Sequence, residues 1–118
     1  MKKFFHLSTC DTCKRIIAEL ELPTDFIQQD IKTVAISGQD LEDMKQLSGS
    51  YEALFSKRAR LYKERNLKEQ SLSEEDYKAL ILEHYTFLKR PVLINEHEIF
   101  VGNSKKSVEA AKASLHML

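Results

Sequence analysis

The chain has 118 residues, of which 42% are hydrophobic and 31% are charged, as in an ordinary globular protein of one domain. Its 18 basic residues balance its 18 acidic residues, which argues against direct nucleic-acid binding because such binding needs a basic excess. The sequence holds no apolar run of about 20 residues, the length of a membrane span, and no signal-peptide core, so we expect a cytoplasmic protein without membrane contacts.

The first part of the chain predicts a strand, a helix and a second strand. The apolar run over residues 4–7 predicts the first strand, which ends at Ser8. From Asp11 the apolar residues recur at helical spacing, and Pro23 is expected to end this helix. Residues 25–31 predict a second, weaker strand.

A helical block follows and includes one basic segment. Asp40 is expected to cap a helix that Gly49 closes, and residues 56–68 are locally basic. Ser73 is expected to cap the next helix, whose apolar stripe runs on until Arg90–Pro91 stops it. The stripe consists of Tyr77, Leu80, Ile81, His84, Tyr85 and Leu88.

The last part of the chain predicts two strands and a helix. Residues 92–94 and 99–101 predict a hairpin around a turn at 95–98. Ser104 is expected to begin a final helix. Its inward side chains would be those of Val108, Ala111, Leu115 and Leu118.

The two cysteines, Cys10 and Cys13, form one C-x-x-C motif where the first strand meets the first helix. Unpaired N–H groups at a helix N-terminus favour a thiolate at Cys10, and Lys14 and Arg15 add positive charge nearby. Cys13 would lie one turn further along, less exposed, where it can attack a mixed disulfide formed on Cys10. The alternative is that both cysteines are small core residues without chemistry.

His6 lies four residues before Cys10 and is a further candidate. It can hydrogen-bond the thiolate or hold charge near it; alternatively, it is a partly buried strand histidine. His6, Cys10 and Cys13 would also make three zinc ligands, with His84 or His97 as a fourth. Structural zinc sites usually have two paired ligand sets, and because only one is visible here, we expect no metal site.

Two arginines are candidates for binding an oxyanion, because a guanidinium presents a planar fork of N–H donors. Arg58 lies in the basic segment, where the alternative is a solvated charged face. Arg90 directly precedes Pro91. In thioredoxin-like folds the residue before such a proline faces the active cysteine, and the proline is often cis. The alternative is that Arg90 only caps the preceding helix.

The element order, the C-x-x-C motif at the first junction and the proline before the third strand predict a thioredoxin-like fold of the α/β class. We expect a single domain over residues 1–118, with a βαβ…ββα mixed sheet. A helical insertion at about 40–88 would separate the two halves of that sheet.

Three segments carry a resemblance to a known family: residues 5–14 around the cysteines, residues 54–58 ending in Arg58, and residues 90–94 with the following 100–102. Here the chain resembles the glutaredoxin-linked arsenate reductase family and its relative, the transcriptional regulator Spx. The resemblance covers nearly the whole chain and implies a thioredoxin-like fold with a helical insertion.

The resemblance also implies roles for single residues. Cys10 matches the cysteine that attacks arsenate, and His6 matches a histidine that favours its thiolate. Arg90 matches the arginine that contacts the oxyanion beside the cis-proline, Pro91, and Arg58 matches an arginine of the Spx-like branch. Glutathione, glutaredoxin or thioredoxin would be the reductant, and no cofactor would be bound.

The chain departs from the reductases at positions that matter for arsenate. Cys13 and Lys14 stand where the reductases usually have Ser and Arg, and Asn103 falls near a third arginine of the family. The oxyanion site is therefore depleted, while Cys13 resembles the redox pair of Spx.

Three functions follow as hypotheses. The first is a thiol oxidoreductase of arsenate reductase type, acting on a small oxyanion or thiol substrate. The second is an Spx-like redox-sensing transcriptional regulator that binds RNA polymerase. The third is a divergent member of the family without reductase activity.

Overall fold

In a computed structural model of the chain, which describes residues 1–116, the polypeptide divides into two compact units. The first unit combines Met1–Val34 with the chain from Arg90 onward, and the second is Ala35–Lys89. The second unit contains the segment in which the sequence predicts a helical insertion. Leu118, expected on the inward face of the last helix, lies outside the described residues.

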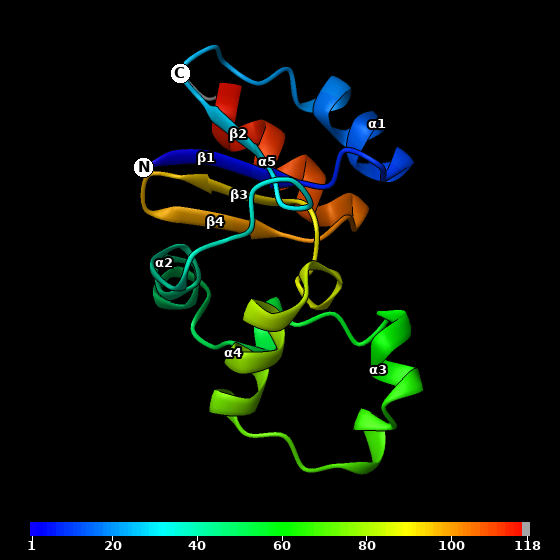
Figure 1. Ribbon diagram of the computed structural model, residues 1–118. Helices are drawn as coiled ribbons and strands as arrows, with labels where there is room; N and C mark the ends of the chain where they lie inside the picture. The colour runs from blue at the N-terminus through cyan, green and yellow to red at the C-terminus, as the bar shows by residue number, and fades with distance from the viewer. Residues whose placement is uncertain (117–118) are drawn as a thin grey trace. The chain divides into compact units, whose positions relative to one another are not determined.

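The described part of the first unit is built on a four-stranded mixed sheet (Figure 1). β1 pairs in parallel with β2 and antiparallel with β3, and β3 pairs antiparallel with β4. The strand order β2-β1-β3-β4 confirms the predicted thioredoxin-like α/β fold. The strands are β1 (Lys2–His6), β2 (Ile27–Asp30), β3 (Val92–Asn95) and β4 (Glu98–Val101).

Helices α1 (Asp11–Leu20) and α5 (Lys105–His116) share one hydrophobic cluster with the sheet. In α1 the buried residues are spaced three and four apart, which puts them on one face of the helix. Burial of this face fixes α1 against the sheet, so the start of the helix is held just beyond the end of β1. The buried members of the cluster are Phe4, Ile16, Leu20, Phe26, Leu93, Val108 and Ala111.

The second unit contains the helices α2 (Gly38–Ser48), α3 (Arg60–Glu64) and α4 (Glu74–Glu83), together with the short 3-10 turns η1 (Glu52–Leu54), η2 (Leu67–Glu69) and η3 (Tyr85–Phe87). Ser73 caps α4 in a reciprocal capping box, as the sequence predicts. The prediction that Asp40 caps α2 is wrong. Ser37 is the cap, and Asp40 is its partner at the third helical position.

The predicted extent of α4 is also wrong, because the helix ends at Glu83 and does not continue towards Arg90. His84 adopts an extended backbone, with φ −148° and ψ 132°, and its Nδ1 accepts a hydrogen bond from the Thr86 N–H at 3.2 Å. This contact starts η3, whose apolar residues prolong the helical spacing of the sequence after the helix itself has ended.

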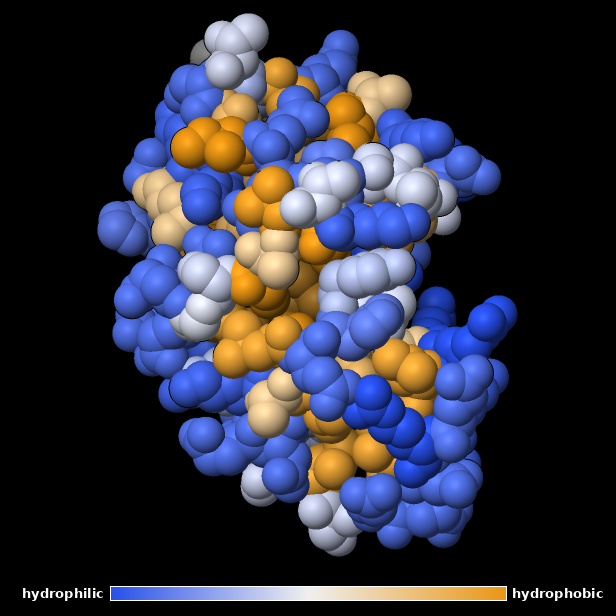
Figure 2. Space-filling model, viewed as in Figure 1, coloured by the Kyte–Doolittle hydropathy of each residue, from blue (hydrophilic) through white to orange (hydrophobic). Residues whose placement is uncertain are grey.

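Hydrophilic residues dominate the surface seen in Figure 2, as expected for a chain in which 31% of the residues are charged. The large hydrophobic side chains that are exposed among the described residues are those of Met1, Ile27, Val34 and Leu82. None of the helices within residues 1–116 has both the length and the apolar character needed to cross a bilayer.

Candidate active site at the start of helix α1

A tight turn leads from β1 into α1 and places Cys10 at the helix N-terminus. The Cys10 N–H donates to the Leu7 carbonyl at 3.0 Å, which closes the turn. The Cys10 carbonyl then accepts from the Lys14 N–H at 3.1 Å, the first hydrogen bond of the helix. Cys10 is therefore the N-cap residue, and its half-buried thiol lies where the helix dipole favours negative charge.

The surroundings of Cys10 lower the pKa of its thiol. Partial burial of the sulfur opposes ionisation, but four favourable contributions outweigh it. These are the backbone N–H and the thiol of Cys13, the Thr12 N–H, and the positive charge of Arg90. The thiolate, the nucleophilic form of cysteine, is thus favoured at this position.

Cys13 has the opposite character, although it lies only one helical turn away. Its side chain is buried, and burial raises the pKa of the Cys13 thiol to about 11. The thiol and the charge of Cys10 raise this pKa as well. The Leu7 N–H and the charge of Arg90 act in the opposite direction and lower it. Both cysteines are free. The pair therefore combines a favoured thiolate with a thiol that stays protonated.

Arg90 and Pro91 lie beside this pair in the same unit. The Arg90–Pro91 peptide bond is cis, as the sequence predicts, and the buried Pro91 accepts a hydrogen bond from the Gly102 N–H at 2.9 Å. The charge of Arg90 lowers the pKa of both cysteines. The alternative in which Arg90 caps the preceding helix is wrong, because that helix ends at Glu83. Binding of an oxyanion by Arg90 stays a prediction.

His6 ends β1, where it pairs with Asp30 of β2. Its ring stacks on Phe4 with 5.8 Å between the centroids, and its Nδ1 is buried without a hydrogen-bond partner. The charge of His6 contributes to lowering the pKa of Asp30, whereas the main influences on the Cys10 pKa come from other residues. The predicted effect of His6 on the Cys10 thiolate stays a prediction.

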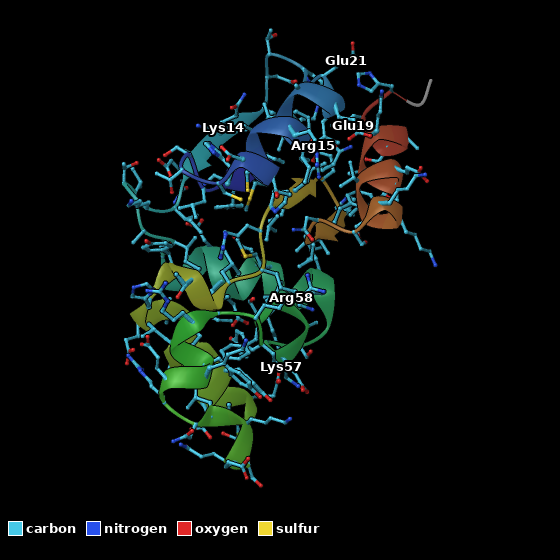
Figure 3. The ribbon with its side chains drawn as sticks, turned by 90° about the vertical axis from the view of Figure 1, so that its right-hand side faces the viewer. Lys14, Arg15, Glu19, Glu21, Lys57 and Arg58 are labelled. Carbon is cyan, nitrogen blue, oxygen red and sulfur yellow. The ribbon has the colours of Figure 1, made fainter. Side chains whose placement is uncertain are left out.

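The remaining predicted basic residues lie on the surface. Lys14 and Arg15 are exposed in the first half of α1, and Glu19 and Glu21 follow towards its C-terminal end (Figure 3). Arg58 is exposed in the second unit, between η1 and α3. Its role in oxyanion binding therefore stays a prediction.

Within residues 1–116, no three His, Cys, Asp or Glu side chains come together in a way that could hold a metal ion. The zinc alternative built on His6, Cys10 and Cys13 thus finds no ligand set in this part of the chain.

One residue next to the site escaped the sequence analysis. Asp30, at the end of β2, accepts hydrogen bonds from both the backbone and the hydroxyl of Ser8, in the turn that precedes Cys10. The only signal in the sequence is an acidic residue at the end of a strand. Its proximity to the turn depends on the parallel register of β1 and β2, which the sequence does not encode in any local pattern.

Comparison with known proteins finds relatives that match most of the chain. The chain is 25% identical to the global transcriptional regulator Spx 2 of Bacillus cereus over 86% of this chain and 79% of that protein. It is 24% identical to Spx of Bacillus subtilis over 85% and 78%.

Two solved structures are also similar. An arsenate reductase from Vibrio cholerae has a TM-score of 0.73 at 24% identity and covers 93% of this chain and 96% of its own. A possible arsenate reductase from Streptococcus mutans has a TM-score of 0.71 at 27% identity and covers 89% and 92%. Residues 5–111, which include both cysteines and the cis-proline, match the ArsC family, and the chain therefore belongs to that family.

Proposed function

We propose that the protein is a cytoplasmic thiol oxidoreductase of arsenate reductase type, with Cys10 as its nucleophile. The observation that carries this proposal is that the pKa values of the two cysteines are shifted in opposite directions. The pKa of Cys10 is lowered, whereas that of Cys13 is raised to about 11. Such a pair offers one thiolate for attack and keeps the second sulfur protonated until it is needed.

With a disulfide substrate the reaction has two exchange steps. The Cys10 thiolate attacks one sulfur, forms a mixed disulfide and releases the first thiolate of the substrate. Cys13 then loses its proton, attacks the Cys10 sulfur and releases the second thiolate, which leaves a Cys10–Cys13 disulfide. Two electrons have passed to the substrate, and glutathione, glutaredoxin or thioredoxin returns them to the protein.

With an oxyanion such as arsenate, Cys10 displaces one hydroxyl group and forms a bond from its sulfur to the arsenic. A second thiol, from Cys13 or glutathione, attacks that sulfur, and the bonding pair leaves with arsenic as arsenite. Arg90 beside Pro91 would stabilise the negative charge through charge-assisted hydrogen bonds. His6 would stabilise the Cys10 thiolate, through a hydrogen bond or through charge near it.

Turnover of a small disulfide other than glutathione disulfide, such as 2-hydroxyethyl disulfide, and of arsenate tests the proposal. Glutathione is the reductant, and NADPH consumption by glutathione reductase is the signal. We expect Cys10→Ser to abolish turnover of either substrate. Cys13→Ser should be severe if the internal pair resolves the intermediate and mild if glutathione does. Detectable activity of Cys10→Ser, or no activity of the wild-type chain with either substrate, would refute the proposal.

A second candidate is a redox-sensing regulator that binds RNA polymerase. The observation in its favour is that the curated relatives above are named global transcriptional regulators. Here a Cys10–Cys13 disulfide would switch binding instead of serving turnover. Co-purification with RNA polymerase that depends on the oxidation state of the pair would support this candidate, and its absence in both states would remove it.

A further inference from the structure

The carboxylate of Asp30 ties the end of β2 to the turn that carries Cys10. Its Oδ1 accepts the Ser8 N–H at 3.2 Å and the Lys32 N–H at 3.2 Å, and its Oδ2 accepts the Ser8 hydroxyl. Ser8 lies inside the turn that the Cys10 N–H closes on the Leu7 carbonyl. The Asp30 side chain, which belongs to β2, thus anchors the turn between β1 and α1.

Asp30 is itself well anchored. Its carbonyl accepts the Val34 N–H at 2.9 Å, and the neighbouring Ile31 N–H donates to the His6 carbonyl at 2.9 Å, which extends the pairing with β1. The Ser8 hydroxyl, the N–H groups of Ser8 and Lys32, and the charge of His6 together lower the pKa of the Asp30 carboxyl. The carboxylate is therefore charged at neutral pH, and hydrogen bonds to a charged acceptor are stronger than neutral ones.

We propose that Asp30 is a positioning residue for Cys10, which holds the β1–α1 turn through Ser8 and so keeps Cys10 at the N-terminus of α1. The proposal rests on the proposed function, in which Cys10 is the nucleophile. Asp30 acts through Ser8 and need not contact a substrate. By holding the turn, Asp30 determines how strongly the N–H groups of the first helical turn stabilise the Cys10 thiolate.

Two effects of removing Asp30 have opposite signs, which makes the proposal testable. Loss of a nearby negative charge by itself would lower the Cys10 pKa or leave it unchanged. Loss of the anchor would let the turn move, weaken the N–H contacts to the Cys10 sulfur and raise its pKa. A rise in the pKa therefore reports positioning and not charge.

The experiment measures the thiolate pKa of Cys10 in the full chain, by thiolate absorbance and by the pH dependence of alkylation. In Asp30→Ala we expect a rise of about half a unit to one unit, the range of a helix N-terminal interaction. The midpoint of the pH dependence of alkylation would then move up by the same half unit to one unit. Asp30→Asn keeps the Oδ1 acceptor, and its amide can donate to the Ser8 hydroxyl. In this variant the Cys10 pKa should therefore equal the wild-type value or lie below it.

Asp25→Ala is the matched control. Asp25 is another aspartate of the first unit with a lowered pKa. It is exposed, whereas Asp30 is half-buried, and its partner is Lys2 at 2.9 Å and not the turn. It should leave the Cys10 pKa unchanged. If Asp30→Ala does not fold, as judged by circular dichroism, Ser8→Ala removes only the hydroxyl donor and should give a smaller rise.

Three results would overturn the proposal: an unchanged or lowered Cys10 pKa in the folded Asp30→Ala or Ser8→Ala chain, an equal rise in Asp30→Asn, or an equal rise in Asp25→Ala. A wild-type Cys10 pKa at the ordinary thiol value is a different outcome. It would contradict the proposed function, before any variant is compared.

Discussion

The strongest prediction concerns selective alkylation of the reduced chain at neutral pH. At pH 7 a thiol with a pKa of about 11, as for Cys13, is ionised in about one molecule in ten thousand. Cys10 has a pKa below the ordinary value of 9.0, so its thiolate fraction is at least about one in a hundred. The two populations therefore differ by at least about a hundredfold.

Part of this difference is offset, because a thiolate of higher pKa is the better nucleophile. With a Brønsted slope of about 0.4–0.5, two pKa units make the Cys13 thiolate about tenfold more reactive. Titration alone thus leaves Cys10 at least about tenfold faster. Burial increases the ratio, since the Cys13 side chain is only 1% exposed.

The assay is brief treatment with iodoacetamide between pH 5 and pH 10, followed by peptide mass spectrometry of each cysteine. Because ionisation increases with pH, the Cys10 rate should rise about tenfold per pH unit below its pKa and level off above it. In Cys10→Ser, Cys13 should still react slowly, because burial is the largest cause of its raised pKa. Equal rates for the two cysteines, or faster modification of Cys13, would refute the assignment of Cys10 as the nucleophile.

Three further predictions follow from single contacts. Arg90→Met should raise the thiolate pKa of Cys10 and Cys13 together, because the charge of Arg90 lowers both; a shift in neither, seen by thiolate absorbance, would contradict this. Ser73→Ala should lower the free energy of unfolding by about 1 kcal/mol through loss of its capping box, measured by urea denaturation with an unchanged Cys10 alkylation rate. Leu93→Ala should cost about 2–5 kcal/mol, because Leu93 is 2% exposed within the core cluster; a loss below 1 kcal/mol would show that the site collapses.

The sequence predicts the fold where one local pattern decides the outcome. Ser73 begins α4 because a serine followed three residues later by Asp76 satisfies two backbone donors reciprocally. The same motif begins α2, where Ser37, three residues before Asp40, is the cap that the sequence prediction assigns to Asp40. The end of α4 was missed because His84 caps η3 with its own side chain, and the apolar spacing gives no sign of that contact.

In the candidate site, too, some features can be predicted from a local pattern and others cannot. Cys10 and Cys13 are evident from their motif, and Pro91 from its place before a strand. Their titration is not evident, because the raised pKa of Cys13 comes first from burial, and burial depends on the packing of α1. Asp30 was missed for a stronger reason, since its contact with Ser8 joins residues that are 22 positions apart.

The sheet register explains why these separate parts of the chain meet. β1 and β2 run in parallel, with His6 opposite Asp30, so both strands end at the same edge. β3 runs antiparallel to β1 with Val92 opposite Phe5, so β3 begins where β1 ends. The turn to Cys10, the Asp30 carboxylate and the Arg90–Pro91 bond therefore share one edge of the sheet.

A one-residue slip of β1 against β3 would displace Arg90 along the strand by about 3.3 Å, and it would also move Val92 and Leu93 to the opposite faces of the sheet. Leu93 belongs to the core cluster with Phe4, so such a slip would expose or misplace buried side chains. The packing that stabilises the fold thus also fixes the distance from Arg90 to the cysteines. Substitutions that keep this core would preserve the charge environment of Cys10 even where the rest of the sequence has diverged.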